Sequence, residues 1–176
     1  QSVCRGMTYV ITGAYPISGL PDSISFLGRG YVQDISWLPW PVFIMLLIFV
    51  AAHFVAQRTK FGRSIYAVGG NAEAAHLSGI KHQKVQIVTF VICGLLAAVS
   101  GMILPSRLAS GQPRGGLTWE FAAVTGAVSG GVSITGGRGK VFGAFLGAVL
   151  IGLLTNGMTL LDINSYYQQV VKGVVL

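Results

Sequence analysis

The glycine and lysine at positions 139 and 140 form the first candidate for chemistry, a phosphate-binding loop. That loop has the pattern GxxxxGK[ST], in which backbone amides cradle phosphates and the lysine reaches them. Gly139 and Lys140 fit the end of the pattern, but Ile134 stands where its first glycine belongs and Val141 replaces the hydroxyl residue. We therefore expect no nucleotide to bind by this route.

Nucleophilic and metal chemistry also lack complete motifs. The segment 131–135 reads GVSIT, so the nucleophile elbow GxSxG fails at its second glycine. There is no HExxH, and Cys4 and Cys93 are far apart without a CxxC. We expect both cysteines to be buried free thiols that behave as small apolar residues. The sequence predicts no metal and no cofactor.

His53 lies in an apolar segment near one end. An ionisable residue inside a membrane is a functional hypothesis by default, but the favoured interpretation is a neutral imidazole that reaches toward the interface. An intramembrane enzyme with His53 or Ser133 as its reactive group stays open as an alternative. It lacks a paired base and nucleophile.

The elements that would position these residues belong to a membrane. Of 176 residues 52% are hydrophobic and 10% are charged, whereas about a quarter are charged in an ordinary soluble domain. Such a chain cannot coat a water-facing surface, and it is too apolar for disorder. Its net charge of +7 indicates basic loops on one side of a membrane more than a site for nucleic acid.

Long uncharged segments predict membrane-spanning helices, which need about 20 apolar residues each. The clearest are 40–56, 85–104 and 141–161. Residues 1–15 look like the tail of a preceding span and 166–176 like the start of another, so both ends look truncated. Segment 121–135 is a thin span or a half-helix, and the alternation of loop charge favours counting it as a crossing. We expect one all-α, polytopic transmembrane domain over 1–176 with about five spans.

The basic residues predict its orientation. Loop 57–84 carries five cations against Glu73 alone, and link 136–140 carries two. The positive-inside rule makes these two segments cytoplasmic. Loop 16–39, the mildly basic loop 105–118 and the turn at 162–165 then fall outside.

Small residues recur at the spacing used where helices pack in membranes. Two GxxxG motifs are present, formed by Gly126 with Gly130 and by Gly143 with Gly147. Lipid supplies little hydrophobic drive between helices, so close backbone contact holds them together. We expect these four glycines to pack helices rather than to touch a substrate.

The cytoplasmic loop contains a predicted short helix. Asn71 follows two glycines and is a plausible N-cap for a helix from Ala72 to Leu77, with Glu73 in its first turn. Ser78 and Gly79 are a natural stop. Such an element is a docking surface or a connector.

The same residues resemble a known signature. Glu73, Ala74, Ala75 and Gly79 fit EAAxxxG, which is similar to the cytoplasmic loop motif of permeases in ATP-binding-cassette (ABC) importers. The stretch TKFGRSIYAVGGNAEAAHLSGI resembles the ribose, xylose and galactose branch of that family. The resemblance continues through 94–113, 129–161 and 165–176.

The resemblance implies the C-terminal half of a roughly ten-span permease without catalysis of its own. Two such subunits, identical or different, would lie in the bacterial inner membrane, bind two cytoplasmic ATPase subunits and take a ribose-like monosaccharide from a periplasmic binding protein. The helix at Glu73–Gly79 would be the coupling helix that docks on the ATPase. No cofactor and no nucleic acid are implied.

Polar and aromatic residues near the C-terminus are the candidates for contact with the sugar. A sugar hydroxyl needs amide, hydroxyl or aromatic partners, and the candidates are Asn156, Tyr166, Tyr167 and Gln168. Each could instead bond between helices or anchor a helix at the interface. A non-transporting scaffold subunit is the second alternative.

Overall fold

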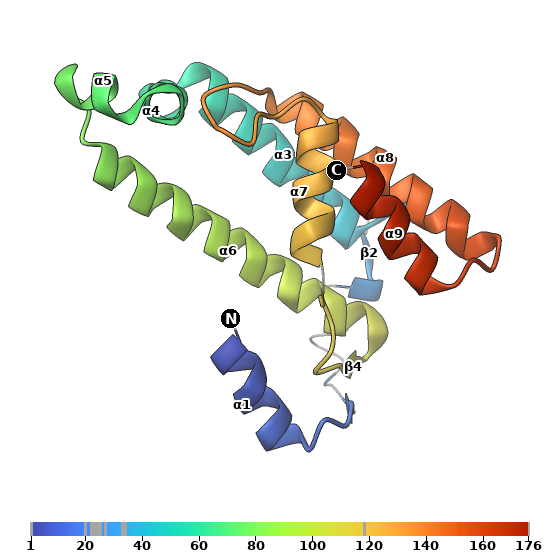
Figure 1. Cartoon of the computed structure of the whole chain (residues 1–176). Coiled ribbons are helices and arrows are strands. Elements are labelled where there is room, and N and C mark those ends of the chain that lie inside the picture. The colour runs from blue at the N-terminus through green and yellow to red at the C-terminus, as the bar shows by residue number, and fades with distance from the viewer. Residues whose placement is uncertain are drawn as a thin grey trace. The chain divides into compact units, whose positions relative to one another are not determined.

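The computed structural model describes residues 2–19, 21, 26, 28–32, 35–117 and 119–175. Its backbone divides into two compact units, each considered by itself below. The first unit comprises residues 1–48 and 90–117, and the second comprises residues 49–89 and 118–176. Figure 1 gives the element labels.

Three helices of the described chain are long and apolar enough to cross a membrane. They are α3 (Trp40–Arg58), α6 (His82–Leu108) and α8 (Val141–Leu160). They coincide with the three long predicted spans, and the all-α prediction is confirmed. At most 11% of any of their apolar windows is buried inside the chain, so lipid or further protein must cover these helices.

Three helices overlapping the remaining candidate spans at 1–15, 121–135 and 166–176 are each 11 residues long: α1 (Ser2–Thr12), α7 (Trp119–Ser129) and α9 (Ser165–Val175). Eleven residues extend only about 16 Å, roughly half of the hydrocarbon layer. About five spans are expected from the sequence. The described chain has three helices that are long enough to cross a membrane, and its other helices are shorter. Segment 121–135 contains the half-helix α7 and not a complete helical crossing, because the chain leaves the helix at its glycine-rich end.

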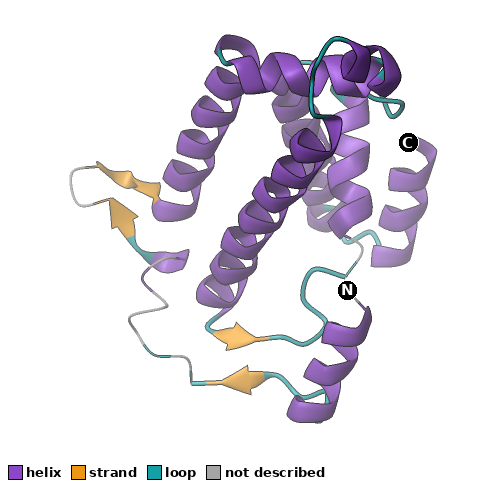
Figure 2. Cartoon of the chain, turned by 90° about the vertical axis from the view of Figure 1, so that its left-hand side faces the viewer, coloured by secondary structure: helices purple, strands orange, loops and turns teal. Residues whose placement is uncertain are grey.

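Short strands join the loops of the first unit (Figure 2). Strand β1 (Ile17–Ser18) pairs antiparallel with β4 (Ser110–Gly111), and β2 (Tyr31–Val32) pairs with β3 (Ile35–Pro39). The β1–β4 pair brings together the loops 16–39 and 105–118, which the charge pattern places on one side of the membrane.

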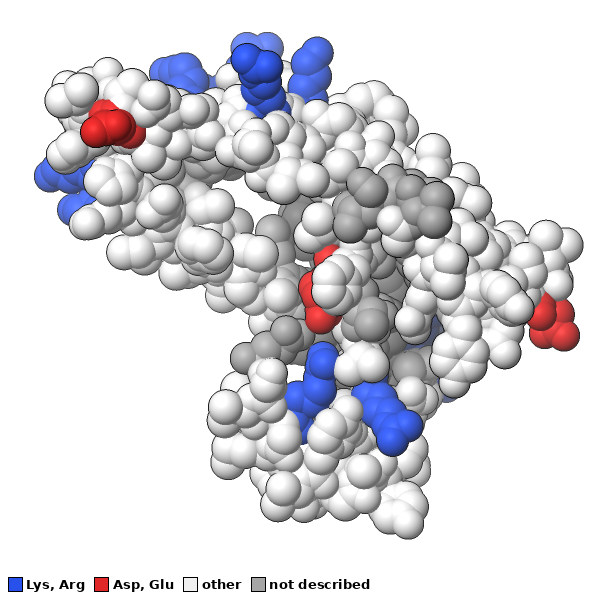
Figure 3. Space-filling model, in the orientation of Figure 1, with Lys and Arg blue, Asp and Glu red and all other residues white. Residues whose placement is uncertain are grey.

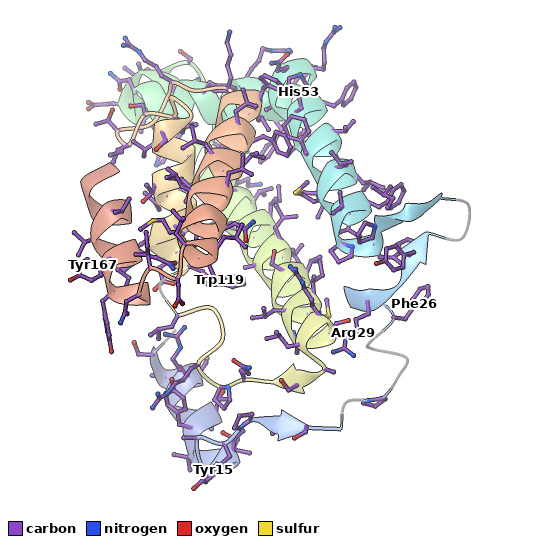
Figure 4. The ribbon with its side chains drawn as sticks, turned by 90° about the vertical axis from the view of Figure 1, so that its right-hand side faces the viewer. Tyr15, Phe26, Arg29, His53, Trp119 and Tyr167 are labelled. Atoms are coloured by element: carbon purple, nitrogen blue, oxygen red, sulfur yellow. The ribbon has the colours of Figure 1, made fainter. Side chains whose placement is uncertain are left out.

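A side-chain hydrogen bond also joins these two loops. Arg29 Nε donates to the Arg107 carbonyl oxygen at 3.2 Å, and Figure 4 shows Arg29 and Phe26 in this region. The Phe26 ring lies 5.8 Å from the ring of Trp40, the first residue of α3. The two outer loops are therefore joined by the β1–β4 pair, by the Arg29 hydrogen bond and by Gly28, which lies against the backbone of Ser106 and Arg107. The Phe26–Trp40 contact instead joins loop 16–39 to α3.

Both cysteines are free, as expected, but the prediction that they are buried was wrong. Cys4 on α1 and Cys93 on α6 are exposed on the chain. The apolar surface around them is also exposed, because a membrane helix turns apolar side chains outward.

Candidate functional site

The segment predicted as loop 57–84 is mostly helical. After α3 ends at Arg58, helix α4 (Lys60–Gly70) begins at once. Thr59 is its N-cap: its hydroxyl accepts a hydrogen bond from the Gly62 amide at 3.1 Å and donates to the Val55 carbonyl at 2.6 Å. Helix α4 is not predicted from the sequence, because Gly69 and Gly70 indicate a turn, whereas both residues belong to the helix and Asn71 is its C-cap.

The predicted short helix is present as α5 (Ala72–Leu77) with the predicted caps. Asn71 Oδ1 accepts hydrogen bonds from the amides of Glu73 and Ala74, each at 3.0 Å. At the other end the Gly79 amide donates to His76 at 2.9 Å and the Ile80 amide to Ala75 at 3.0 Å. These two bonds form a Schellman motif. Gly79 has φ +81°, a left-handed conformation that glycine adopts without strain.

The motif residues divide between two faces of α5. Ala75 is only 4% exposed, and α5 contacts α4, where Val68 is also buried. Glu73 is exposed and Leu77 is 85% exposed. Residues four apart share one helix face, so Glu73 and Leu77 form an outward face while Ala75 is the inward anchor. Ala74 is exposed as well.

The end of α4 lies directly against the loop between α7 and α8. A Cβ added at Gly69 would lie 2.6 Å from the Gly137 nitrogen, and one added at Gly137 would lie 2.5 Å from Gly70 Cα. Figure 1 shows this loop beside α4. The two segments that the charge pattern assigns to the cytoplasm are therefore adjacent.

These adjacent segments concentrate positive charge. Lys and Arg side chains gather over α4 and its surroundings, with an acidic side chain on α5 (Figure 3). Glu73 is the sole acidic residue between 49 and 89 in the sequence. Another acidic side chain, Asp162, follows the far end of α8, about 30 Å along the helix axis from Lys140.

The four predicted packing glycines meet at one interface. The α7 side of the interface is formed by Gly126 and Gly130, and the α8 side by Gly143 and Gly147. The Gly126 carbonyl oxygen lies against Gly147, and the Gly130 and Gly143 backbones touch. A Cβ added at Gly126 would lie 3.0 Å from Ala148 Cα. The half-helix α7 therefore packs antiparallel to α8 at backbone distance.

The four candidate sugar contacts lie on the last turns of α8 and the first turns of α9. Asn156, Tyr166 and Tyr167 are exposed, and Figure 4 shows Tyr167 on α9. The Gln168 amide donates to Thr159 Oγ1 at 3.3 Å and to the Ile163 carbonyl at 3.1 Å. Gln168 thus connects α9 to the end of α8. Among the described residues, no hydrogen bond joins any two of the four candidate sugar contacts.

The residues considered for catalysis have non-catalytic neighbours. The His53 ring lies 6.1 Å from the Phe49 ring, in an aromatic cluster in which Phe49 and Phe145 are 4.5 Å apart. Figure 4 shows His53 near the end of α3. The Ser133 hydroxyl pairs with that of Thr135 at 2.8 Å rather than with a base. Across the described residues no cluster of metal-ligating side chains occurs.

Together, the three long apolar helices, the glycine-packed half-helix and the capped surface helix define a multi-pass helical membrane protein. The chain belongs to the family described as branched-chain amino acid transport system / permease component, whose model matches residues 3–176.

Curated relatives narrow the comparison to sugar permeases. The chain is 45% identical to the ribose import permease protein RbsC of Bacillus subtilis, covering 100% of this chain and 54% of the relative. It is 41% identical to RbsC of Escherichia coli strain K12, covering 98% and 54%. It is 43% identical to the xylose transport system permease protein XylH of that strain, covering 82% and 37%.

The chain thus spans about half the length of the ribose permeases it matches. The coverages state how much of each relative's length is matched but not which part of it. The assignment of this chain to the C-terminal half therefore stays a prediction. No solved structure matches the chain.

Proposed function

We propose that this chain is part of the permease subunit of an ABC importer that moves a ribose-like monosaccharide across the bacterial inner membrane. The observation that carries the proposal is α5, a separately capped helix whose Glu73 and Leu77 face outward from a basic surface. Identities of 41–45% to ribose permeases over nearly the whole chain support it.

The proposed partners follow from this function. A cytoplasmic ATPase supplies the energy, a second permease subunit completes the pathway, and a periplasmic binding protein delivers the sugar. The chain itself catalyses no reaction, and no cofactor is required. Neither His53 nor Ser133 has a catalytic partner among the described residues, and the relatives are transport proteins, which favours this function over an intramembrane enzyme or a scaffold.

The outward face of α5 fits the docking of a helix in a groove. The caps hold α5 in one conformation before it binds, which lowers the entropic cost of association. Leu77 offers an apolar side chain for a groove of the ATPase, and Glu73 offers a negative charge to a cation on that partner. Ala75 holds the opposite face against the permease.

Asn156 is the strongest of the proposed path residues. It is an exposed amide within the uncharged helix α8. An amide facing hydrocarbon without a partner is costly. We therefore place Asn156 toward the sugar path or the second subunit, while Tyr166 and Tyr167 remain candidates and Gln168 serves the turn between α8 and α9.

Charge reversal at Glu73 tests the docking role. In the complete importer, Glu73→Lys should lower co-purification of the ATPase and reduce sugar uptake by more than about tenfold, because a reversed interface charge costs several kcal/mol. The matched control is Gln83→Lys, which also introduces a lysine at an exposed position, but outside α5. Equal uptake and co-purification in Glu73→Lys and wild type would overturn the docking assignment.

The same assay separates the alternatives. A scaffold would keep uptake in Glu73→Lys. An intramembrane enzyme would show an ATP-independent activity that is lost in His53→Ala.

A further inference from the structure

We infer that Gly69 and Gly137 are positioning residues that transmit movement of α5 to the α7–α8 pair. The inference rests on the proposed function, because it assumes that α5 is moved by an ATPase. It adds the site at which that movement enters the membrane part of the chain. The contact joins two segments separated by more than 60 residues in the sequence.

The contact consists of backbone alone. A Cβ at Gly69 would lie 2.6 Å from the Gly137 nitrogen, and one at Gly136 would lie 2.8 Å from the Gly69 carbonyl oxygen. Real Cβ atoms essentially never approach other atoms this closely. Because no rotatable side chain lies between the two backbones, a displacement of one is met directly by the other.

The contact between Gly69 and Gly137 adjoins an open space. Next to it lies a pocket of about 530 Å³ lined by Tyr66 of α4 and by Arg138, Lys140 and Phe142 at the start of α8. Side chains therefore leave open the space between α4 and the start of α8. Beside this pocket, the backbone contact at Gly69 joins α4 to the loop at Gly136 and Gly137.

The loop is built to carry a displacement onward. The Ser133 amide donates to the Arg138 carbonyl at 3.0 Å, and the Gly136 amide to Ser133 at 3.2 Å. These bonds close the loop into a compact turn between the end of α7 and the start of α8. Since α7 and α8 pack at backbone distance through Gly130 and Gly143, they should move as one body.

Neighbouring glycines provide a matched test. A methyl group at Gly69 collides with the loop, whereas one at Gly70 meets nothing within 4 Å. In the complete importer reconstituted in proteoliposomes, Gly69→Ala should raise the ATP hydrolysed per sugar transported at least about fivefold. Gly70→Ala should match wild type. Equal ratios in Gly69→Ala and Gly70→Ala would overturn the inference.

A second pair separates collision from backbone strain. Gly137 (φ +71°) and Gly131 (φ +84°) both need a left-handed conformation, but only at Gly137 would the methyl group collide with α4. Gly137→Ala should therefore uncouple ATP hydrolysis from uptake more than Gly131→Ala does. Equal uncoupling by both would assign the effect to strain and contradict the inference.

Hydrogen exchange on the unmodified importer tests the inference without relying on variants that insert correctly. Adding a non-hydrolysable ATP analogue should change amide protection in residues 66–80 and in residues 133–140 together. A change confined to 66–80 would show that α5 docks but does not act through the loop. No change in either segment would instead count against the docking role, so the two failures are distinguishable.

Discussion

Single residues set the shape of α5, and Gly79 does so through its backbone. It is the last letter of the EAAxxxG motif, and the Schellman bonds around it require φ +81°. A Cβ there would meet open space, so its constraint is conformational rather than steric. This separates Gly79 from Gly69, where the constraint is a collision.

Substitutions at Gly79 should therefore rank by left-handed propensity. Gly79→Val should destabilise the end of α5 by about 1–2 kcal/mol and lower sugar uptake. Gly79→Asn should retain both, because asparagine visits this conformation readily. Uptake and hydrogen exchange of residues 72–80 measure the two effects. Similar results for Val and Asn would show that the conformation of Gly79 is not the relevant property.

Asn156 makes a second prediction at this scale. Asn156→Leu should reduce uptake about two- to tenfold, the effect of losing one hydrogen bond to a sugar, while ATPase co-purification stays normal. Asn156→Gln, which keeps the amide, is the conservative control. Unchanged transport in Asn156→Leu would place this side chain outside the path.

Residue-level predictions succeeded where the determinant is local. Asn71 and Gly79 mark the ends of α5 in the sequence because caps depend on neighbouring amides and carbonyls. The contact between Gly69 and Gly137 depends on tertiary packing, and no spacing of residues in the sequence predicts it. A glycine pair precedes Asn71 and another precedes Arg138, but their spacing does not predict that the two pairs meet.

Among the elements, the long spans were the most predictable. An uncharged run of about 20 residues has few alternatives to a membrane helix, and α3, α6 and α8 follow the predicted segments closely. Helix α4 was missed because it is basic and contains glycines. Helix α7 was over-extended because the composition of 121–135 does not show that the helix ends at Ser129.

The interface between α7 and α8 yields a prediction about stability. Gly147→Ala pushes a methyl group against the Gly126 carbonyl, whereas a methyl at Gly152 on the same helix meets nothing within 4 Å. Overpacking costs about 1–3 kcal/mol, so Gly147→Ala should lower the thermal unfolding midpoint in detergent. Gly152→Ala should leave it unchanged or raise it, because alanine favours helix. The opposite order would contradict this packing.

At the scale of the whole molecule, the charge pattern and the contacts group the same segments. The two basic segments touch at Gly69 and Gly137, and the two segments expected outside pair through β1 and β4. The positive-inside rule had grouped the same segments without any contact information. The contacts support this grouping, while the orientation of the two groups in the membrane stays a prediction.

Labelling measures this orientation directly. Cysteines placed at Arg138 and Asp162, at opposite ends of α8, should react with a membrane-impermeant reagent from opposite sides: position 138 from the cytoplasm and position 162 from outside. The exposed native residues Cys4 and Cys93 must first be replaced by alanine. Reaction of both positions from one side would refute the crossing of α8.

The β1–β4 pairing has a consequence for the outer face. It involves only two residue pairs, Ile17 with Gly111 and Ser18 with Ser110, and each hydrogen bond contributes about 0.5–1.5 kcal/mol net. Parting these loops would expose polar groups to water and break no helix. Because Arg29 also donates to the Arg107 carbonyl oxygen and Gly28 lies against the backbone of Ser106 and Arg107, separating the two loops costs more than the β1–β4 hydrogen bonds alone.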